Sequence, residues 1–171
     1  MEKVELILKV FPYLEQAQGL LNLIRDQKAD RNLRLVDLAV LERSQDGETR
    51  IIETREIKAG KGALLGTLAG GLLGLFAGPV GGLLGAAAGA AAGGILAYRL
   101  DFGFSDQFLK EINLVLQPGT SAILILVENL WVERLLDVME PFPGKTFRHA
   151  VRSQLIEQLK KTFDESTNQP D

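Results

Sequence analysis

The chain has 171 residues, which is enough for one domain with an insertion and too few for two full domains. Its 22 acidic and 19 basic residues give a formal net charge of −3. We therefore expect no nucleic-acid partner, because such binding usually needs a basic face. Cysteine is absent, which excludes disulfides, zinc–thiolate sites and thiol chemistry. Most of the charged residues lie in two flanks around an apolar segment, residues 62–98.

The first flank begins with a predicted strand and a predicted helix. Residues 3–11 alternate in polarity, with Glu5 and Lys9 on what we expect to be the wetter face of a strand. Pro12 then opens a helix, since its fixed φ suits the first helical turn. The helix carries apolar residues at helical spacing: Leu14, Ala17, Leu20, Leu21 and Ile24.

Two further strands follow and indicate a hairpin. They cover residues 33–43 and roughly 49–57. Between them stands Asp46-Gly47, a pair that favours positive φ and is typical of a tight turn between antiparallel strands.

The second flank, after the apolar segment, alternates helices and strands. Ser105 is a predicted N-cap for a helix with one apolar face. The sequence "QPGT" breaks this helix, and residues 121–128 are apolar on both faces, as expected of a buried central strand. The remaining predicted elements are a helix capped by Asn129, a short strand around 145–150, and an amphipathic helix with Leu155, Ile156, Leu159 and Phe163.

This order of elements predicts an α+β fold with an insertion. With the apolar segment set aside, the first six elements match the βαββαβ ferredoxin-like plan, an antiparallel sheet with helices on one face. The extra helix, strand and helix would extend that sheet. The predicted parts are two pieces of the α+β domain, 1–58 and 100–163, an inserted glycine-zipper helical hairpin, 59–99, and a disordered tail, 164–171.

The inserted segment, "GALLGTLAGGLLGLFAGPVGGLLGAAAGAAAGG", repeats glycine at four-residue steps. The two series are Gly62, Gly66, Gly70, Gly74 and Gly78, then Gly81, Gly85, Gly89 and Gly93. Residues four apart share a helix face, so each arm would carry a groove without side chains. Gly78-Pro79 predicts a sharp turn between the arms. We therefore predict that these glycines pack the arms together and mediate oligomerisation, as small residues do between helices in lipid.

The sequence leaves two possible environments for this hairpin, a lipid bilayer or the interior of a soluble oligomer. Taken as helices, the arms would each be about 25 to 27 Å long at ~1.5 Å per residue, slightly short of a hydrocarbon core of about 30 Å. Glycine is a poor helix former in water, by about 1 kcal/mol relative to alanine, which favours a lipid-inserted hairpin over an exposed one. The alternative is a soluble homo-oligomeric ring or cage with the apolar hairpins packed inside it.

The residues that flank the hairpin predict its orientation. Lys58 and Lys61 precede the first arm, and Tyr98 and Arg99 end the second. A two-arm hairpin returns to its starting side, so the three cations would lie together. The positive-inside rule then places the α+β domain in the cytoplasm, with the hairpin in the inner membrane. In the alternative without insertion, the whole protein would be cytoplasmic.

Other candidate sites have simpler explanations. The glycines at 60–66 resemble a dinucleotide-binding turn, but the acidic residue expected about twenty positions later is missing. His149 is the only histidine, and we expect it to be structural. Four carboxylates are close in sequence near the hairpin base: Glu53, Glu56, Asp101 and Asp106. They could hold a hard cation, but pairing with neighbouring arginines and lysines is the simpler expectation. We therefore expect no enzymatic activity, no cofactor and no metal site.

The order of parts resembles a bacterial family of uncharacterised, membrane-annotated proteins, domain-of-unknown-function family 1269. The resemblance rests on the N-terminal βαββ pattern, the glycine segment, and "FLKEINLVLQPGTSAILILV", in which a helix, a Pro-Gly-Thr break and a buried strand follow one another. It implies membrane association and no assigned activity, so no catalytic residue is carried over. The hairpin is also similar to glycine-zipper stress proteins of bacterial envelopes.

The leading hypothesis is therefore a non-enzymatic, membrane-associated homo-oligomer whose partners are further copies of itself and the lipid bilayer. An envelope or stress role is compatible with it. A soluble assembly is the runner-up. A third possibility is an enzyme or ligand-binding module with a pocket between sheet and helices.

Overall fold

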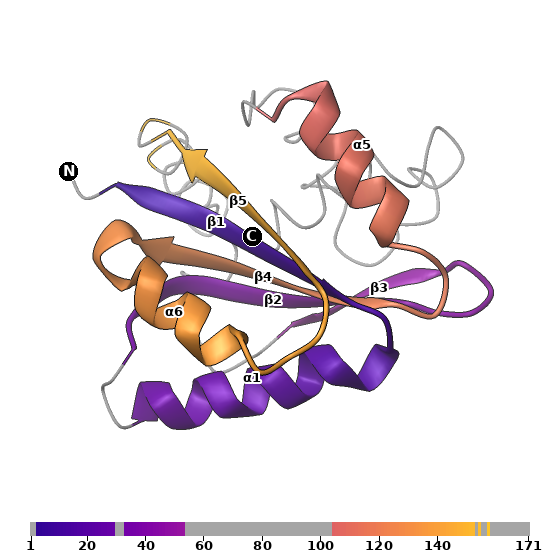
Figure 1. Cartoon of the computed structure of the whole chain (residues 1–171), viewed down its shortest axis with the longest axis horizontal. Coiled ribbons are helices and arrows are strands. Elements are labelled where there is room, and N and C mark those ends of the chain that lie inside the picture. Colours follow the sequence, from indigo (N-terminus) through magenta and orange to yellow (C-terminus); the bar gives the residue numbers. More distant parts are fainter. Residues whose placement is uncertain (1–2, 30–32, 54–103, 153, 155–156, 158–171) are drawn as a thin grey trace, which may run out of the picture.

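The computed structural model describes residues 3–29, 33–53, 104–152, 154 and 157. Within them the chain forms an antiparallel α+β fold (Figure 1), which confirms the predicted class. The elements are β1 (Val4–Phe11), α1 (Leu14–Ala29), β2 (Leu35–Arg43), β3 (Thr49–Glu53), α5 (Asp106–Val115), β4 (Ser121–Glu128), the 3-10 turn η2 (Asn129–Trp131), α6 (Val132–Met139) and β5 (Lys145–Val151). Asn129 therefore begins a 3-10 turn, and α6 starts three residues later than its predicted cap.

The described strands form one sheet in the order β3-β2-β4-β1-β5, and every neighbouring pair is antiparallel. β4 lies at the centre and is buried at all positions but its last, as its apolar sequence predicts. The allocation of the first six elements to a βαββαβ plan is not confirmed. β3 lies at an edge, and β4 lies between β2 and β1.

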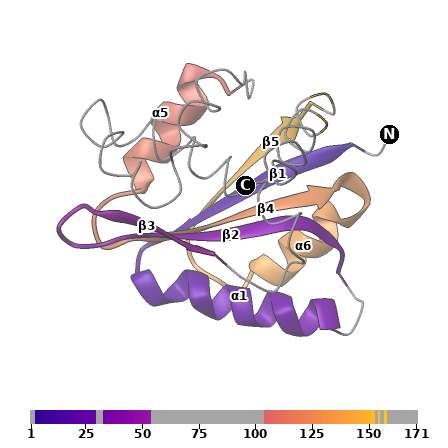
Figure 2. The same cartoon turned by 180° about the vertical axis from the view of Figure 1, so that it is seen from behind.

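The two faces of the sheet are covered by different helices (Figures 1 and 2). α1 and α6 lie on one face and contact each other. α5 lies on the opposite face, which we call the junction face. Successive side chains of a strand point to opposite faces, so β4 contributes to two separate cores. It gives Ile123, Ile125 and Val127 to the α1–α6 side and Ala122, Leu124 and Leu126 to the junction face.

The expectation that all the helices share one face is therefore wrong for α5. Because β4 and β1 are apolar on both sides, a single helical layer would leave one side of the sheet exposed to water. α5 covers part of that second side with the buried side chain of Ile112 and with partly buried side chains beside it, and the next residue after the helix, Leu116, is also buried there.

Lys9 departs from the predicted wetter face of β1. The strand has no wet face at this point: Lys9 is only 5% exposed and lies on the side where Ile7 and Phe11 meet the helices. Its Nζ donates a hydrogen bond of 3.1 Å to the carbonyl oxygen of Met139, the last residue of α6. An ammonium group suits this position, because the last carbonyls of a helix lack partners within the helix.

The predicted hairpin, residues 59–99, lies outside the described residues, and so does the tail at 164–171. This applies to both glycine series, to Pro79 and to the four flanking residues. Among the helices that the structure describes, none has the length and apolar character needed to cross a membrane.

Candidate functional site

The junction face is the candidate site, because α5 packs there and aromatic and polar contacts gather around it. The register joins Glu53, Ala39, Leu124, Leu8 and Phe147 in one row across the five strands. The connection 54–103 therefore starts at one edge of the sheet. Its end is beside the other edge, as the aromatic contacts of the next paragraph show. Four strand spacings of ~4.8 Å separate the two edges by about 19 Å.

An aromatic cluster fixes the returning chain over β5. The Phe104 ring lies against His149, with 4.6 Å between ring centroids, and stacks on Phe108 at 5.2 Å. Phe108 in turn meets His149 at 5.3 Å and the edge of Phe147 at 6.1 Å. Offset and edge-on arrangements of this kind add to the stability that burial gives. His149 thus lies in β5, within this aromatic cluster.

Polar contacts hold both ends of α5. At its start the Ser105 side chain accepts a hydrogen bond of 3.1 Å from the Phe108 N–H, which confirms the predicted N-cap. At its end the Arg43 Nη1 donates a hydrogen bond of 2.7 Å to the Leu116 carbonyl, so a cation from β2 satisfies the helix C-terminus. On the outer side Lys145 lies 3.5 Å from Glu111 and over the Phe147 ring. α5 is therefore fastened to β2 at one end and to the edge strand β5 on its outer side.

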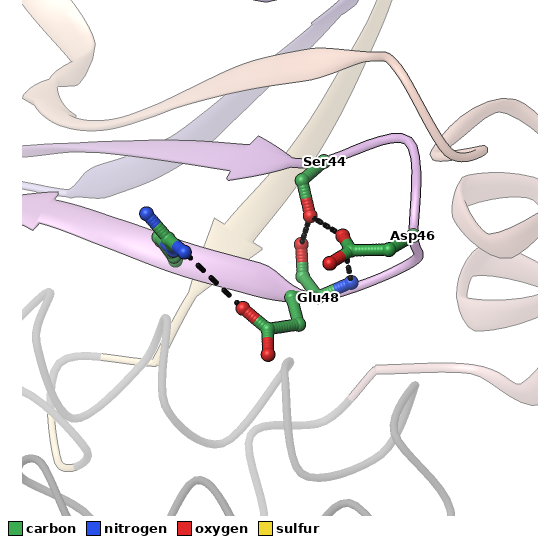
Figure 3. A network of polar contacts seen from close by, with 4 residues as sticks. Ser44, Asp46 and Glu48 are labelled. Atoms are coloured by element: carbon green, nitrogen blue, oxygen red, sulfur yellow. Dashed lines mark hydrogen bonds and ion pairs between the residues drawn. The ribbon is translucent and has the colours of Figure 1, made fainter.

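The β2–β3 turn lies beside the end of α5 and has its own polar network (Figure 3). Ser44 donates hydrogen bonds to the Asp46 carboxylate and to the Glu48 carbonyl. Gly47 has the positive φ of 86° that Asp46-Gly47 predicts. Hydrogen bonds, first from Ser44 and then from the Glu48 backbone, lower the pKa of Asp46. Asp46 and Glu48 are exposed and Ser44 is half-buried, so the network lies at the surface and shapes the turn.

Close contact joins this turn to the loop before β4. Gly119 has a φ of 84°, and a Cβ built there would lie 2.5 Å from the Gln45 side chain. The Gly119 N–H donates a hydrogen bond of 2.8 Å to the Arg43 carbonyl. The predicted Pro-Gly-Thr break therefore lets the chain pass from α5 into the sheet directly beside the hairpin turn.

Asp37 is the residue of the junction face that the sequence-based reasoning missed. It lies in β2 opposite Leu126 and is 0% exposed. Its Oδ1 accepts a hydrogen bond of 2.8 Å from the Leu38 N–H. A single acidic residue inside the apolar run "LVDLAVL" was the available signal. Carboxylates are rarely buried this fully unless they are paired.

The structure brings together few of the predicted carboxylates. Asp106 is exposed in the first turn of α5, where an acidic side chain favours the helix dipole. Glu56 and Asp101 lie outside the described residues, and the Glu53 side chain is not described. In the part of the chain that the structure covers, no three His, Asp or Glu side chains are grouped so that they could hold a metal ion.

Comparison with known proteins identifies a family. The model of a family described as "Protein of unknown function (DUF1269)" matches residues 61–164. The match confirms the family that the sequence resembles, and it runs from the predicted hairpin through α5, β4, α6 and β5. A comparison with curated proteins gives no significant match, and neither does one with solved structures.

Proposed function

The chain belongs to the DUF1269 family, and we propose that it is a non-enzymatic, membrane-associated protein that forms homo-oligomers through residues 59–99. The observation that carries the proposal is the sequence between Lys61 and Arg99. It has no charged residue and holds two glycine series at four-residue steps. Packed as helices, such faces let backbones approach closely, within one hairpin and between neighbouring copies.

The layout of the domain supports an insertion at this point. Without β3 and α5, the described elements run β1-α1-β2-β4-α6-β5, and their strands lie in the order β2-β4-β1-β5. We propose that these six elements are the ferredoxin-like unit. β3, the connection 54–103 and α5 would then form one long insertion between β2 and β4, two strands that lie side by side. A connection between adjacent strands can lengthen at little cost in stability.

Charge supports the orientation. In the proposed arrangement Lys58, Lys61 and Arg99 lie on the side of the membrane that holds the α+β domain. Cations beside a membrane span favour the cytoplasmic side. The hairpin is then in the inner membrane and the sheet is in the cytoplasm, with Tyr98 near the lipid headgroups.

The glycine series provide a test with matched controls. Gly70→Leu and Gly85→Leu place a bulky side chain on the proposed packing faces, whereas Gly71→Leu and Gly82→Leu add the same side chain outside both series. Chemical crosslinking of the full chain should show that the first pair weakens assembly by at least about tenfold, equivalent to ~1.4 kcal/mol. Unchanged oligomer size, or an equal effect of the two pairs, would contradict assembly through these glycines.

Fractionation separates this proposal from its alternative, a soluble ring or cage with the hairpins packed inside. An inserted hairpin should sediment with membranes, resist washing with high salt, and enter solution when detergent is added. Recovery without detergent as a large particle would favour the soluble assembly. An uncharged segment can be buried between subunits as well as in lipid. This experiment therefore decides whether lipid or neighbouring subunits surround the hairpin.

A further inference from the structure

The 3-10 turn η2, which follows β4, presents apolar side chains to solvent. Among the described residues, Leu130 is the most exposed large hydrophobic side chain, at 81%. Its neighbour Trp131 is half-buried, because part of the side chain packs on the α1–α6 core. A single exposed leucine is common on protein surfaces. What η2 can bind therefore depends on the groups around it.

The register places η2 at one end of the sheet, where several strands begin or end (Figure 1). Val4 pairs with both Glu128 and Val151, so β1 starts where β4 and β5 end. β2 also begins there, because Leu35 pairs with Val127. We call this part of the domain, with the turn at its tip, the η2 end.

Exposed cations surround the turn. They stand directly before β1 and β2, in the first turn of α6 and directly after β5: Lys3, Arg34, Arg134 and Arg152. The acidic residues next to the turn are Glu128 and Glu133, and Glu133 lies 3.4 Å from the Arg148 guanidinium. The opposite end of the sheet exposes acidic side chains at Asp46, Glu48 and Glu140. Positive charge is therefore concentrated beside the exposed apolar side chains.

This combination fits the surface of an anionic bilayer better than a protein partner. Tryptophan is enriched where membrane and water meet, and leucine gains free energy when it enters the boundary of the acyl chains. Lysine and arginine beside such residues are attracted to anionic headgroups. A specific protein interface needs about 1,000 Å² or more of buried surface, which two adjacent apolar side chains do not supply.

The direction of β3 agrees with a membrane on this side. Thr49 pairs with Arg43 and Glu53 pairs with Ala39, so β3 runs toward the η2 end. We propose that the η2 end is a lipid-docking surface: Leu130 and Trp131 enter the headgroup region of an anionic bilayer, and the surrounding cations contact lipid phosphates. The inference rests on the proposed function, because an inserted hairpin holds the domain beside the bilayer. It adds the orientation of the domain, with β4 and β5 directed at the membrane.

Tryptophan fluorescence tests the docking, because Trp131 is the only tryptophan in the chain. The full chain is reconstituted into vesicles of phosphatidylcholine and phosphatidylglycerol, some of whose acyl chains carry bromine near the headgroup. We expect the brominated lipids to quench Trp131. Leu130→Asp should shift docking about tenfold toward the undocked state, because an apolar side chain is replaced by a negative charge. Leu114→Asp is the control: Leu114 is 75% exposed on α5, and its replacement should leave the quenching unchanged.

The outcomes distinguish this inference from the proposed function. Protein that does not float with the vesicles would contradict membrane association and the docking together. Protein that floats while Trp131 escapes quenching by lipid would overturn the docking alone. A smaller oligomer in Leu130→Asp, with quenching unchanged, would assign the turn to a contact between subunits and would also overturn it.

The cations give a second test of the same surface. Arg34→Gln and Arg134→Gln should each weaken docking by about fivefold in vesicles that contain phosphatidylglycerol. Arg50→Gln removes an exposed cation far from η2 and should have no such effect. High salt should weaken docking of the natural protein as well, since it screens exposed charges. Equal quenching in vesicles of phosphatidylcholine alone would overturn the assignment of an anionic lipid surface.

Discussion

The α1–α6 side of the sheet and the junction face are both apolar, but they are covered in different ways. α1 joins β1 to β2 and also contacts β4, and α6 follows β4 and leads into β5. Ser121 ties α1 to the sheet, because its Oγ donates to the Tyr13 carbonyl at 2.6 Å. On the junction face, α5 follows the connection 54–103, and contacts of the helix or of residues beside it reach β2 and the edge strand β5.

This difference concerns how much of each helix is buried. Both sides join segments that are far apart in the chain, as the hydrogen bonds from Lys9 to Met139 and from Arg43 to Leu116 show. The buried side chains of α1 and α6 are Ala17, Leu20, Leu21, Ile24, Val132, Leu135 and Met139, whereas α5 buries Ile112 alone. We infer that the α1–α6 side is the more cooperative unit. The junction face is then the part that opens first and the part through which the insertion is coupled to the sheet.

The largest expected effect compares two adjacent residues of β4. Ile125 points to α1 and α6, and Leu124 points to the junction face; both are fully buried. Replacing either with alanine should lower the free energy of unfolding by about 3 kcal/mol, measured by urea denaturation. Amide hydrogen exchange should then rise mainly in α1 and α6 for Ile125→Ala, and mainly in α5 for Leu124→Ala. The same exchange pattern in both variants would remove the distinction between the faces.

A smaller effect is expected from the aromatic cluster. Phe108 is half-buried between Phe104, Phe147 and His149, so Phe108→Ala should cost about 2 kcal/mol and raise hydrogen exchange at the start of α5. Leu114 is the matched control on the same helix. It is 75% exposed, and Leu114→Ala should change stability by less than about 0.5 kcal/mol. Equal losses in the two variants would show that the cluster does not hold α5.

The sequence predicted the elements well because their signals are local. The two-sided apolar run of β4, the Asp46-Gly47 turn and the Ser105 cap each depend on a few neighbouring residues. Strand order depends on which distant segments pair, and chain order alone does not reveal that β4 enters between β1 and β2. Helical spacing likewise shows that α5 has an apolar side, but not which face of the sheet it covers.

The same limit applies to the polar residues of the candidate site. Arg43 belongs to β2 in sequence, yet its guanidinium serves the end of α5, 73 positions away. Asp37 and Lys9 interrupt apolar runs, and alternation alone assigns such residues to a solvent-exposed face. Both are buried, and Lys9 lies against the end of α6. The predicted glycine sites lie outside the described residues and stay predictions.

The smallest expected effect is the pH dependence that Lys9 introduces on the α1–α6 side. Burial lowers the pKa of Lys9 below its usual 10.5, and the negative charge of Glu140 opposes part of that shift. Between the lowered pKa and 10.5 the unfolded chain binds the proton more tightly than the folded chain. The free energy of unfolding therefore rises with pH through this window.

Lys9→Met should remove this rise while leaving stability near neutral pH within about 1 kcal/mol of the natural protein. The hydrogen bond to the Met139 carbonyl is lost, but so is the cost of burying a charge, and the two changes oppose each other. Urea denaturation of both proteins from neutral to alkaline pH isolates the contribution of Lys9, because all other groups titrate in both. Parallel pH profiles would mean that the amine is as well solvated in the folded protein as in the unfolded chain. The α1–α6 side would then admit water at this point, which would weaken its contrast with the junction face.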